Sequence, residues 1–183
     1  MTDFLQDHPD GQILALDEMS LYFQATTTRL WSPLGQTPSV WVSPQRDYVH
    51  FCGVLNLRTG HEFVVPVLQQ TGEATVNILR DLLLCYPTQA ILLVWDRASW
   101  HKGTAVNTLL DNHPRLETIF FPPACPELNP QEHVWSLARA AVSHNHPFST
   151  FQQLKQAFWE FLSCTLFPFD WLAKYAPAIL FDV

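Results

Sequence analysis

The stretch that decides the fold of this chain reads Ile91-Leu-Leu-Val-Trp-Asp-Arg-Ala-Ser-Trp-His101. Its first five residues are a continuous apolar run of strand-forming types, which is typical of a strand buried on both faces inside a sheet that helices cover. The run stops at Asp96, and polar side chains follow directly. Functional groups collect at such points, because the rigid part of an open α/β sheet ends where its strands end. The sequence therefore predicts a functional site at Asp96.

The composition is that of a globular protein. Of the 183 residues, 48% are apolar and 15% are charged, so we predict a single domain over residues 1–183 with one sizeable core. No apolar stretch approaches the roughly 20 residues that a membrane span needs. The N-terminus lacks the pattern of a signal peptide. The four cysteines are far apart in the sequence, and we interpret them as reduced thiols of a cytoplasmic protein rather than as disulfides or zinc ligands.

The charge balance limits what the chain can bind without help. It has 17 acidic residues against 10 lysines and arginines, a formal net charge of −7. DNA-binding modules normally carry a basic surface, so this balance counts against strong unaided binding to DNA. It does not exclude chemistry on DNA, because bound divalent cations reverse the local sign of the charge.

The pattern of strands and helices predicts an α/β fold. We expect residues 1–11 to be a loose polar lead-in and residues 26–44 to be a long loop with Trp31 and Trp41 as aromatic anchors. The expected strands are 13–23, 47–57, 61–68, 91–95 and 116–121, and the expected helices are 73–84, 104–110, 130–142 and one from Ser149 or Thr150 onward. An antiparallel meander followed by alternating helices and strands forms a mixed five-stranded sheet, with two parallel strands, flanked by helices. This is the order of a ribonuclease-H-like sheet, with a core over about 12–142 and a C-terminal helical segment over about 148–183.

Acidic side chains occur at three places where this fold could bring them together. Asp17 lies within the first strand, Asp96 ends the fourth, and Glu132 lies in the first turn of a helix. Three such carboxylates can hold two divalent cations about 4 Å apart, which activate water and stabilise the leaving oxygen in phosphoryl transfer. Carboxylate ligands favour Mg²⁺ or Mn²⁺.

Each of these acids also has a purely structural interpretation. Asp17 could pair with a lysine or arginine, and Asp96 could cap the turn after its strand. Asn129 and Glu132 have the spacing of a capping box, with Asn129 at the N-cap and Glu132 at the third helical position. Spacing alone leaves both interpretations open.

Longer motifs around these acids resemble a known family. They occur in the order Leu16-Asp-Glu-Met-Ser-Leu-Tyr22, Trp31-Ser-Pro-Leu-Gly35, Val94-Trp-Asp-Arg-Ala-Ser-Trp-His101 and Phe121-Pro-Pro-Ala-Cys-Pro-Glu-Leu-Asn-Pro-Gln-Glu-His-Val-Trp135. Together they resemble the catalytic domain of DDE transposases, specifically bacterial insertion-sequence transposases related to the mariner elements. The resemblance covers roughly residues 12–142, and its most specific part is the run Leu-Asn-Pro-x-Glu-x-x-Trp.

The resemblance implies an enzyme and a set of site residues. Asp17, Asp96 and Glu132 would be the catalytic, metal-binding triad of a two-metal Mg²⁺ or Mn²⁺ site. The activity implied is hydrolytic strand cleavage at transposon ends, followed by attack of the freed 3′-hydroxyl on target DNA. His101 matches a family histidine that we expect near the substrate phosphate or behind the metal ligands, although it could instead cap the next helix. We expect Arg97, which stands where the family often has Asn, and Asn129 in the same surroundings.

Two further expectations concern Glu18 and the chain's partners. Glu18 matches the family's Asp-Glu pair, but it points to the opposite side of its strand from Asp17, so we leave it out of the metal ligands. Only about a dozen residues precede the first strand, so we expect a separate or fused helix-turn-helix module to recognise DNA. A homodimer or larger assembly on DNA and a bacterial, nucleoid-associated location are implied by the resemblance only. The alternative is a catalytically silent or domesticated remnant that acts as a binding or interaction domain.

Overall fold

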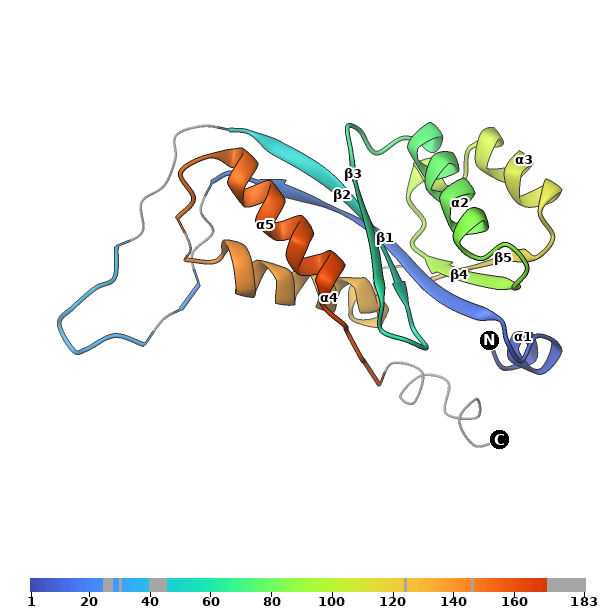
Figure 1. Cartoon of the computed structure of the whole chain (residues 1–183), viewed down its shortest axis with the longest axis horizontal. Helices are drawn as coiled ribbons and strands as arrows, with labels where there is room; N and C mark the ends of the chain where they lie inside the picture. Colours follow the sequence, from blue (N-terminus) through green and yellow to red (C-terminus); the bar gives the residue numbers. More distant parts are fainter. Residues whose placement is uncertain (25–27, 30, 40–45, 124, 146, 171–183) are drawn as a thin grey trace.

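The computed structural model of the chain describes residues 1–24, 28–29, 31–39, 46–123, 125–145 and 147–170 (Figure 1). Its centre is one sheet of five strands in the order β3-β2-β1-β4-β5. The strands are β1 (Gln12–Tyr22), β2 (Tyr48–Asn56), β3 (Glu62–Val67), β4 (Ile91–Trp95) and β5 (Leu116–Phe120). The first three pair antiparallel, whereas β4 runs parallel to both β1 and β5. The predicted mixed, ribonuclease-H-like sheet is confirmed.

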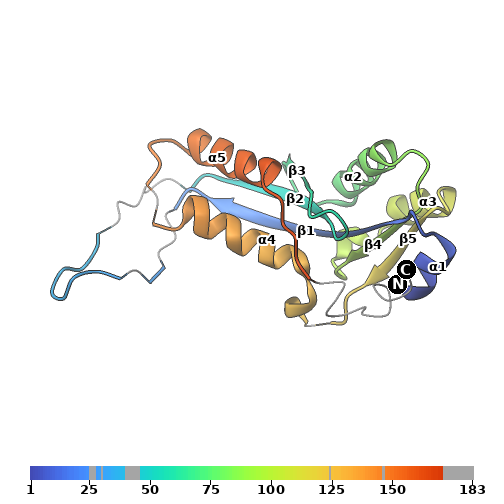
Figure 2. The ribbon, with the colours of Figure 1, turned by 60° about the horizontal axis from the view of Figure 1, so that its bottom comes forward.

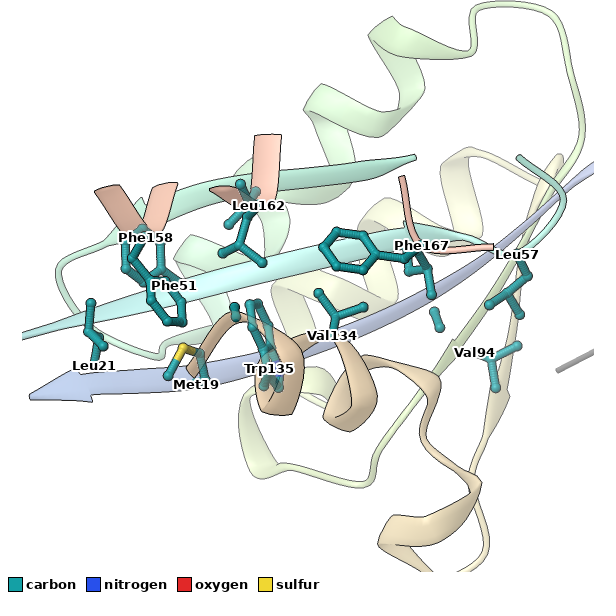
Figure 3. Packing of buried hydrophobic residues seen from close by; sticks show 14 of the residues in the cluster. Met19, Leu21, Phe51, Leu57, Val94, Val134, Trp135, Phe158, Leu162 and Phe167 are labelled. Atoms are coloured by element: carbon teal, nitrogen blue, oxygen red, sulfur yellow. The ribbon is translucent and has the colours of Figure 1, made fainter. Parts of the chain in front are cut away.

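Hydrophobic layers cover both faces of the sheet. The helices α4 (Pro130–Ala138) and α5 (Phe151–Cys164) bury one layer, and α2 (Gly72–Cys85) and α3 (Thr104–Asn112) bury the other. Central β1 serves both layers, because successive residues of a strand point to opposite faces. Figure 2 shows α4 and α5 along one end of β1 and α2 and α3 toward its other end. In the α4 and α5 layer, drawn in Figure 3, the rings of Phe51 and Phe158 stack with centroids 5.6 Å apart.

Side-chain caps begin the long helices where the sequence predicts. Asn129 caps α4 by accepting a hydrogen bond from the Gln131 amide, with Pro130 at the first helical position. Thr150 caps α5 by accepting from the Gln153 amide. The predicted helix over 130–142 is α-helical only to Ala138 and continues as a π-helical turn over Arg139–Ser143. Within the described residues, no helix is long and apolar enough to cross a membrane.

The two ends of β1 correct two sequence predictions. The expected loose lead-in is wrong: Thr2–Asp7 form the short helix α1, because the Phe4 side chain is buried in the core and fixes the segment. The expectation that Trp31 anchors the long loop is also wrong, since Trp31 is 104% exposed and residues 31–39 lie away from the sheet (Figure 1). Trp41, the other expected anchor, lies outside the described residues.

Helix α4 packs closely against the sheet at Gly53. This glycine of β2 lies directly opposite Asp17 of β1 in the strand register. A Cβ atom at Gly53 would overlap the side chains of Glu62, Gln131 and Trp135. The missing side chain therefore lets α4 pack onto the backbone of the sheet beside Asp17.

Gly53→Ala should destabilise the protein by about 1–3 kcal/mol, because the added methyl group overfills a packed interface. Urea denaturation followed by circular dichroism measures the change. Gly103→Ala is the matched control, since a Cβ atom there meets no other atom within 4 Å. Equal unfolding midpoints for the two variants would contradict this account of the helix–sheet contact.

Candidate active site

Asp17 is an acidic side chain in the middle of an otherwise apolar strand. It lies on the sheet face that α4 covers, and the indole Nε1 of Trp135 donates a hydrogen bond to its Oδ2 at 3.2 Å. Burial, followed by the charges of Glu18 and Glu132, raises the pKa of Asp17 to about 7. The expected alternative, a structural ion pair with lysine or arginine, is absent from the described residues. Asp17 is thus held in place without a cation.

Asp96 follows β4 directly, and a bent loop returns to hold it. Its Oδ1 accepts hydrogen bonds from the Ala98 amide at 2.9 Å and from His101 Nδ1 at 2.8 Å. The hydrogen bond from His101 lowers the pKa of Asp96, and the Ala98 amide acts in the same direction. The side chain remains 49% exposed. Asp96 is therefore an ionised carboxylate that is fixed through one oxygen and open to a pocket.

Glu132 is brought to the same pocket by the first turn of α4. The N-cap half of the expected capping box is present, with Asn129 Oδ1 accepting from the Gln131 amide at 3.1 Å. The reciprocal bond from the Glu132 carboxylate to Asn129 does not occur among the described residues, and Glu132 is exposed. The pocket is open and has a volume of about 500 Å³. It is lined by Asp17, Asp96, Arg97, Ala98, Phe121, Pro122, Pro123, Cys125, Asn129 and Glu132.

The three acids share the pocket without forming a closed cage. Nowhere in the described parts of the chain do three His, Cys, Asp or Glu side chains lie close enough together to hold a metal ion as they stand. The donor set nevertheless fits a hard divalent cation, since oxygen ligands line one open pocket. The raised pKa of Asp17 arises partly from repulsion by Glu132, and a cation between the two carboxylates would relieve that repulsion.

His101 lies behind Asp96 rather than in the pocket. Its ring is fully buried, stacks on Trp95 with centroids 4.6 Å apart, and contacts Glu18 Oε1 through Nε2 at 3.1 Å. Burial acts to lower the pKa of His101, but the hydrogen bonds and charges of Asp96 and Glu18 outweigh it and raise the pKa to about 9. His101 therefore contacts Asp96 from the side away from the pocket.

The sequence did not reveal the role of Glu18. It does point away from Asp17, as expected, but on that opposite face it reaches His101 and through it Asp96. Asp17 thus lines the pocket directly, whereas Glu18 acts on Asp96 through His101 from the opposite face of the strand. The signal was present in the alternation of β1, which puts Glu18 on the face where the side chain of Trp95 also lies.

Arg97 places a cation at the rim of the pocket, next to Asp96. Its Nε donates to the Phe121 carbonyl at 3.3 Å, and its guanidinium lies 5.5 Å from the centroid of the Phe120 ring. Lys102 lies 5.7 Å from the same centroid. Two of the ten lysines and arginines therefore meet at one aromatic ring beside the acidic pocket.

The His101 ion pair should make stability depend on pH. Since folding raises the pKa of His101 from 6.5 to about 9, its stabilisation is complete below about pH 6.5 and is lost as the pH rises through 9. The stability difference between wild type and His101→Gln should therefore shrink by an amount on the order of a few kcal/mol between pH 6.5 and 9.5. Urea denaturation in metal-free buffer measures it, with exposed His61→Gln as the control. A difference that is constant over this range would contradict the ion pair.

Known proteins resemble this chain in sequence or in fold. An insertion element IS630 uncharacterized 39 kDa protein of Shigella sonnei is 24% identical over 164 residues, which are 89% of this chain and 47% of that protein. The Mos1 transposase paired-end complex with left transposon end superimposes with a TM-score of 0.69 at 15% identity, over 93% of this chain and 53% of the other. The catalytic domain of Mos1 mariner transposase gives 0.62 at 14% identity, over 93% and 79%.

The match to a family extends over most of the chain. The sequence pattern of the family described as DDE superfamily endonuclease matches residues 12–155, a range that contains the whole sheet, Asp17, Asp96 and Glu132. The chain spans about half the length of the curated relative and of the Mos1 chain in the paired-end complex. With this match the chain belongs to the DDE superfamily endonucleases and has the insertion-element and mariner type of catalytic-domain fold.

Proposed function

We propose that this domain cleaves DNA strands at transposon ends and joins the freed ends to target DNA, using Mg²⁺ or Mn²⁺. One observation carries the proposal: Asp17 of β1, Asp96 directly after β4 and Glu132 of α4 line one open pocket. Membership of the endonuclease family supports the class of reaction. Solved structures of Mos1 support the metals and the substrate, because they include paired-end complexes with Mn and with Mg and a strand transfer complex.

Asp17, Asp96 and Glu132 would hold the metal ions. Two divalent cations supply an activated water and a stabilised leaving oxygen when they are bound. The protein's part is to fix the ligands: Ala98 and His101 hold one oxygen of Asp96, and Trp135 holds one oxygen of Asp17. Carboxylates that are oriented in this way by hydrogen-bonded neighbours bind metal more tightly than mobile ones. Glu18 completes this support by holding His101.

Cations beside the pocket bear on DNA binding, because the chain as a whole carries a net charge of −7. Arg97 lines the pocket, and Lys102 lies over the same Phe120 ring, so that both could neutralise phosphates near the scissile bond. A separate or fused helix-turn-helix module would supply recognition of the transposon ends. Assembly as a dimer or larger complex on DNA, in the nucleoid of a bacterium, belongs to the same proposal.

Asp96→Asn should reduce metal-dependent nicking of supercoiled plasmid by about 100-fold or more, since metal-ion stabilisation of the transition state contributes several kcal/mol. Nicking is measured on gels with Mn²⁺ and with Mg²⁺, and calorimetry measures Mn²⁺ binding. Glu127→Gln is the control, because it removes one negative charge from an exposed side chain shortly before α4. It should leave nicking and Mn²⁺ binding unchanged. Undiminished nicking by Asp96→Asn would contradict the assignment of Asp96 as a metal-binding catalytic residue. A wild-type protein that neither binds Mn²⁺ nor nicks DNA would favour the silent binding domain.

Arg97→Ala should weaken DNA binding and reduce the slope of log affinity against log salt concentration by about 1, because one phosphate contact is lost. Fluorescence anisotropy of a labelled duplex, measured in the Asp96→Asn background to prevent cleavage, gives the slope. Arg80→Ala is the matched control, since Arg80 is an exposed arginine of α2, on the opposite side of the sheet from α4. A slope for Arg97→Ala that equals the wild-type slope would remove Arg97 from the DNA path.

A further inference from the structure

A further acid, Glu62, lies buried near Asp17. It is the first residue of β3, it is only 9% exposed, and its side chain meets α4 beside Gly53. Its Oε1 accepts a hydrogen bond from Nε2 of Gln131, a residue with no exposed surface. Buried carboxylates are rare unless they are paired, so this contact requires an explanation.

Two oxygens of the Glu62–Gln131 pair lack a hydrogen-bond donor among the described residues. They are Glu62 Oε2 and Gln131 Oε1, and both are buried. No cation of the described chain pairs with Glu62, and the nearby charge of Asp17 is of the same sign. Burial is the largest of the effects that raise the pKa of Glu62 well above its usual value. What the pair lacks is one hydrogen-bond donor, and a proton on Glu62 would provide it.

We propose that Glu62 is a neutral carboxylic acid whose Oε2–H donates to Gln131 Oε1, forming a two-bond acid–amide pair that positions Glu132. One proton satisfies both leftover oxygens and removes the buried charge. The pair contains no metal ligand, so Glu62 is a positioning residue. This role rests on the proposed function, in which Glu132 binds metal.

The place of the pair in α4 explains how it acts on Glu132. Gln131 and Glu132 are neighbours in the first turn of α4. Because the Gln131 side chain is held against the sheet by Glu62, the Glu132 side chain points to the pocket. One turn later Trp135 binds Asp17. Helix α4 is thus attached to the sheet on both sides of Glu132, and Gly53 provides the space for both attachments.

The proton also limits the negative charge at the site. Asp17 already experiences repulsion from Glu18 and Glu132. An ionised Glu62 would add a further buried negative charge near Asp17, with one amide hydrogen bond to compensate it. As a neutral acid, Glu62 gives α4 a polar attachment without this cost.

Infrared spectroscopy tests the protonation state directly. The Asp17→Asn variant is used as the background, because Asp17 itself retains a proton near neutral pH. At pH 7 this background should show the carbonyl stretch of a protonated carboxylic acid, and adding Glu62→Gln should remove it. Adding Glu117→Gln, at an exposed acid, should not. No loss of the band on adding Glu62→Gln would overturn the proposal.

Metal affinity tests the positioning role. Glu62→Gln keeps a neutral hydrogen-bonding group and should retain Mn²⁺ affinity. Glu62→Leu should lower it about 10-fold to 100-fold, as expected when a group that orients a ligand is lost. Equal affinities for the folded Leu and Gln variants would overturn the role. If the wild type binds no Mn²⁺, the proposed metal site fails and the positioning role fails with it, whereas the infrared band still decides the protonation state by itself.

Discussion

The contact between α4 and the sheet at Gly53 is the constraint on which the candidate site depends. At this point a helix packs onto a strand with no side chain between them, so the backbone of β2 comes within reach of Gln131 and Trp135. Trp135 can then bind Asp17, and the preceding turn presents Glu132 to the same pocket. A larger residue at position 53 would push the helix away and separate acids that come from distant parts of the sequence.

Repulsion between the carboxylates of the site costs folding free energy, and the structure offsets it in two ways. Around Asp96 the fold supplies a buried cation, because His101 is held between Asp96 and Glu18 and keeps its proton. On the α4 face no cation of the described residues pairs with Asp17, and burial together with the charges of Glu18 and Glu132 lets it retain a proton up to about pH 7. In our proposal Glu62 does the same. The site thus combines an ionised carboxylate that is open to the pocket with acids whose charge awaits a metal ion.

The support of Asp96 passes across the sheet. Glu18 and His101 belong to the α2 and α3 face, whereas Asp17, Glu62 and Gln131 belong to the α4 face. Asp96 lies just beyond the end of β4. It can therefore bind His101 on the first face and still line a pocket on the second. This arrangement explains why neighbouring acids on β1 both matter although their side chains point in opposite directions.

The sequence by itself determined the order of strands and helices and the starts of α4 and α5. These features follow from local patterns: apolar runs, alternation and capping residues. The three acids that meet in the pocket were singled out by the motifs that resemble the transposase family, because their spacing alone left structural roles open. The short helix α1 and the exposure of Trp31 were decided by tertiary packing, because one needs a core to receive Phe4 and the other lacks a surface to cover. The Glu18–His101–Asp96 chain and the Glu62–Gln131 pair were also decided there. Each joins residues from separate elements, and only the register of the strands and the close approach of α4 bring their atoms within hydrogen-bond distance.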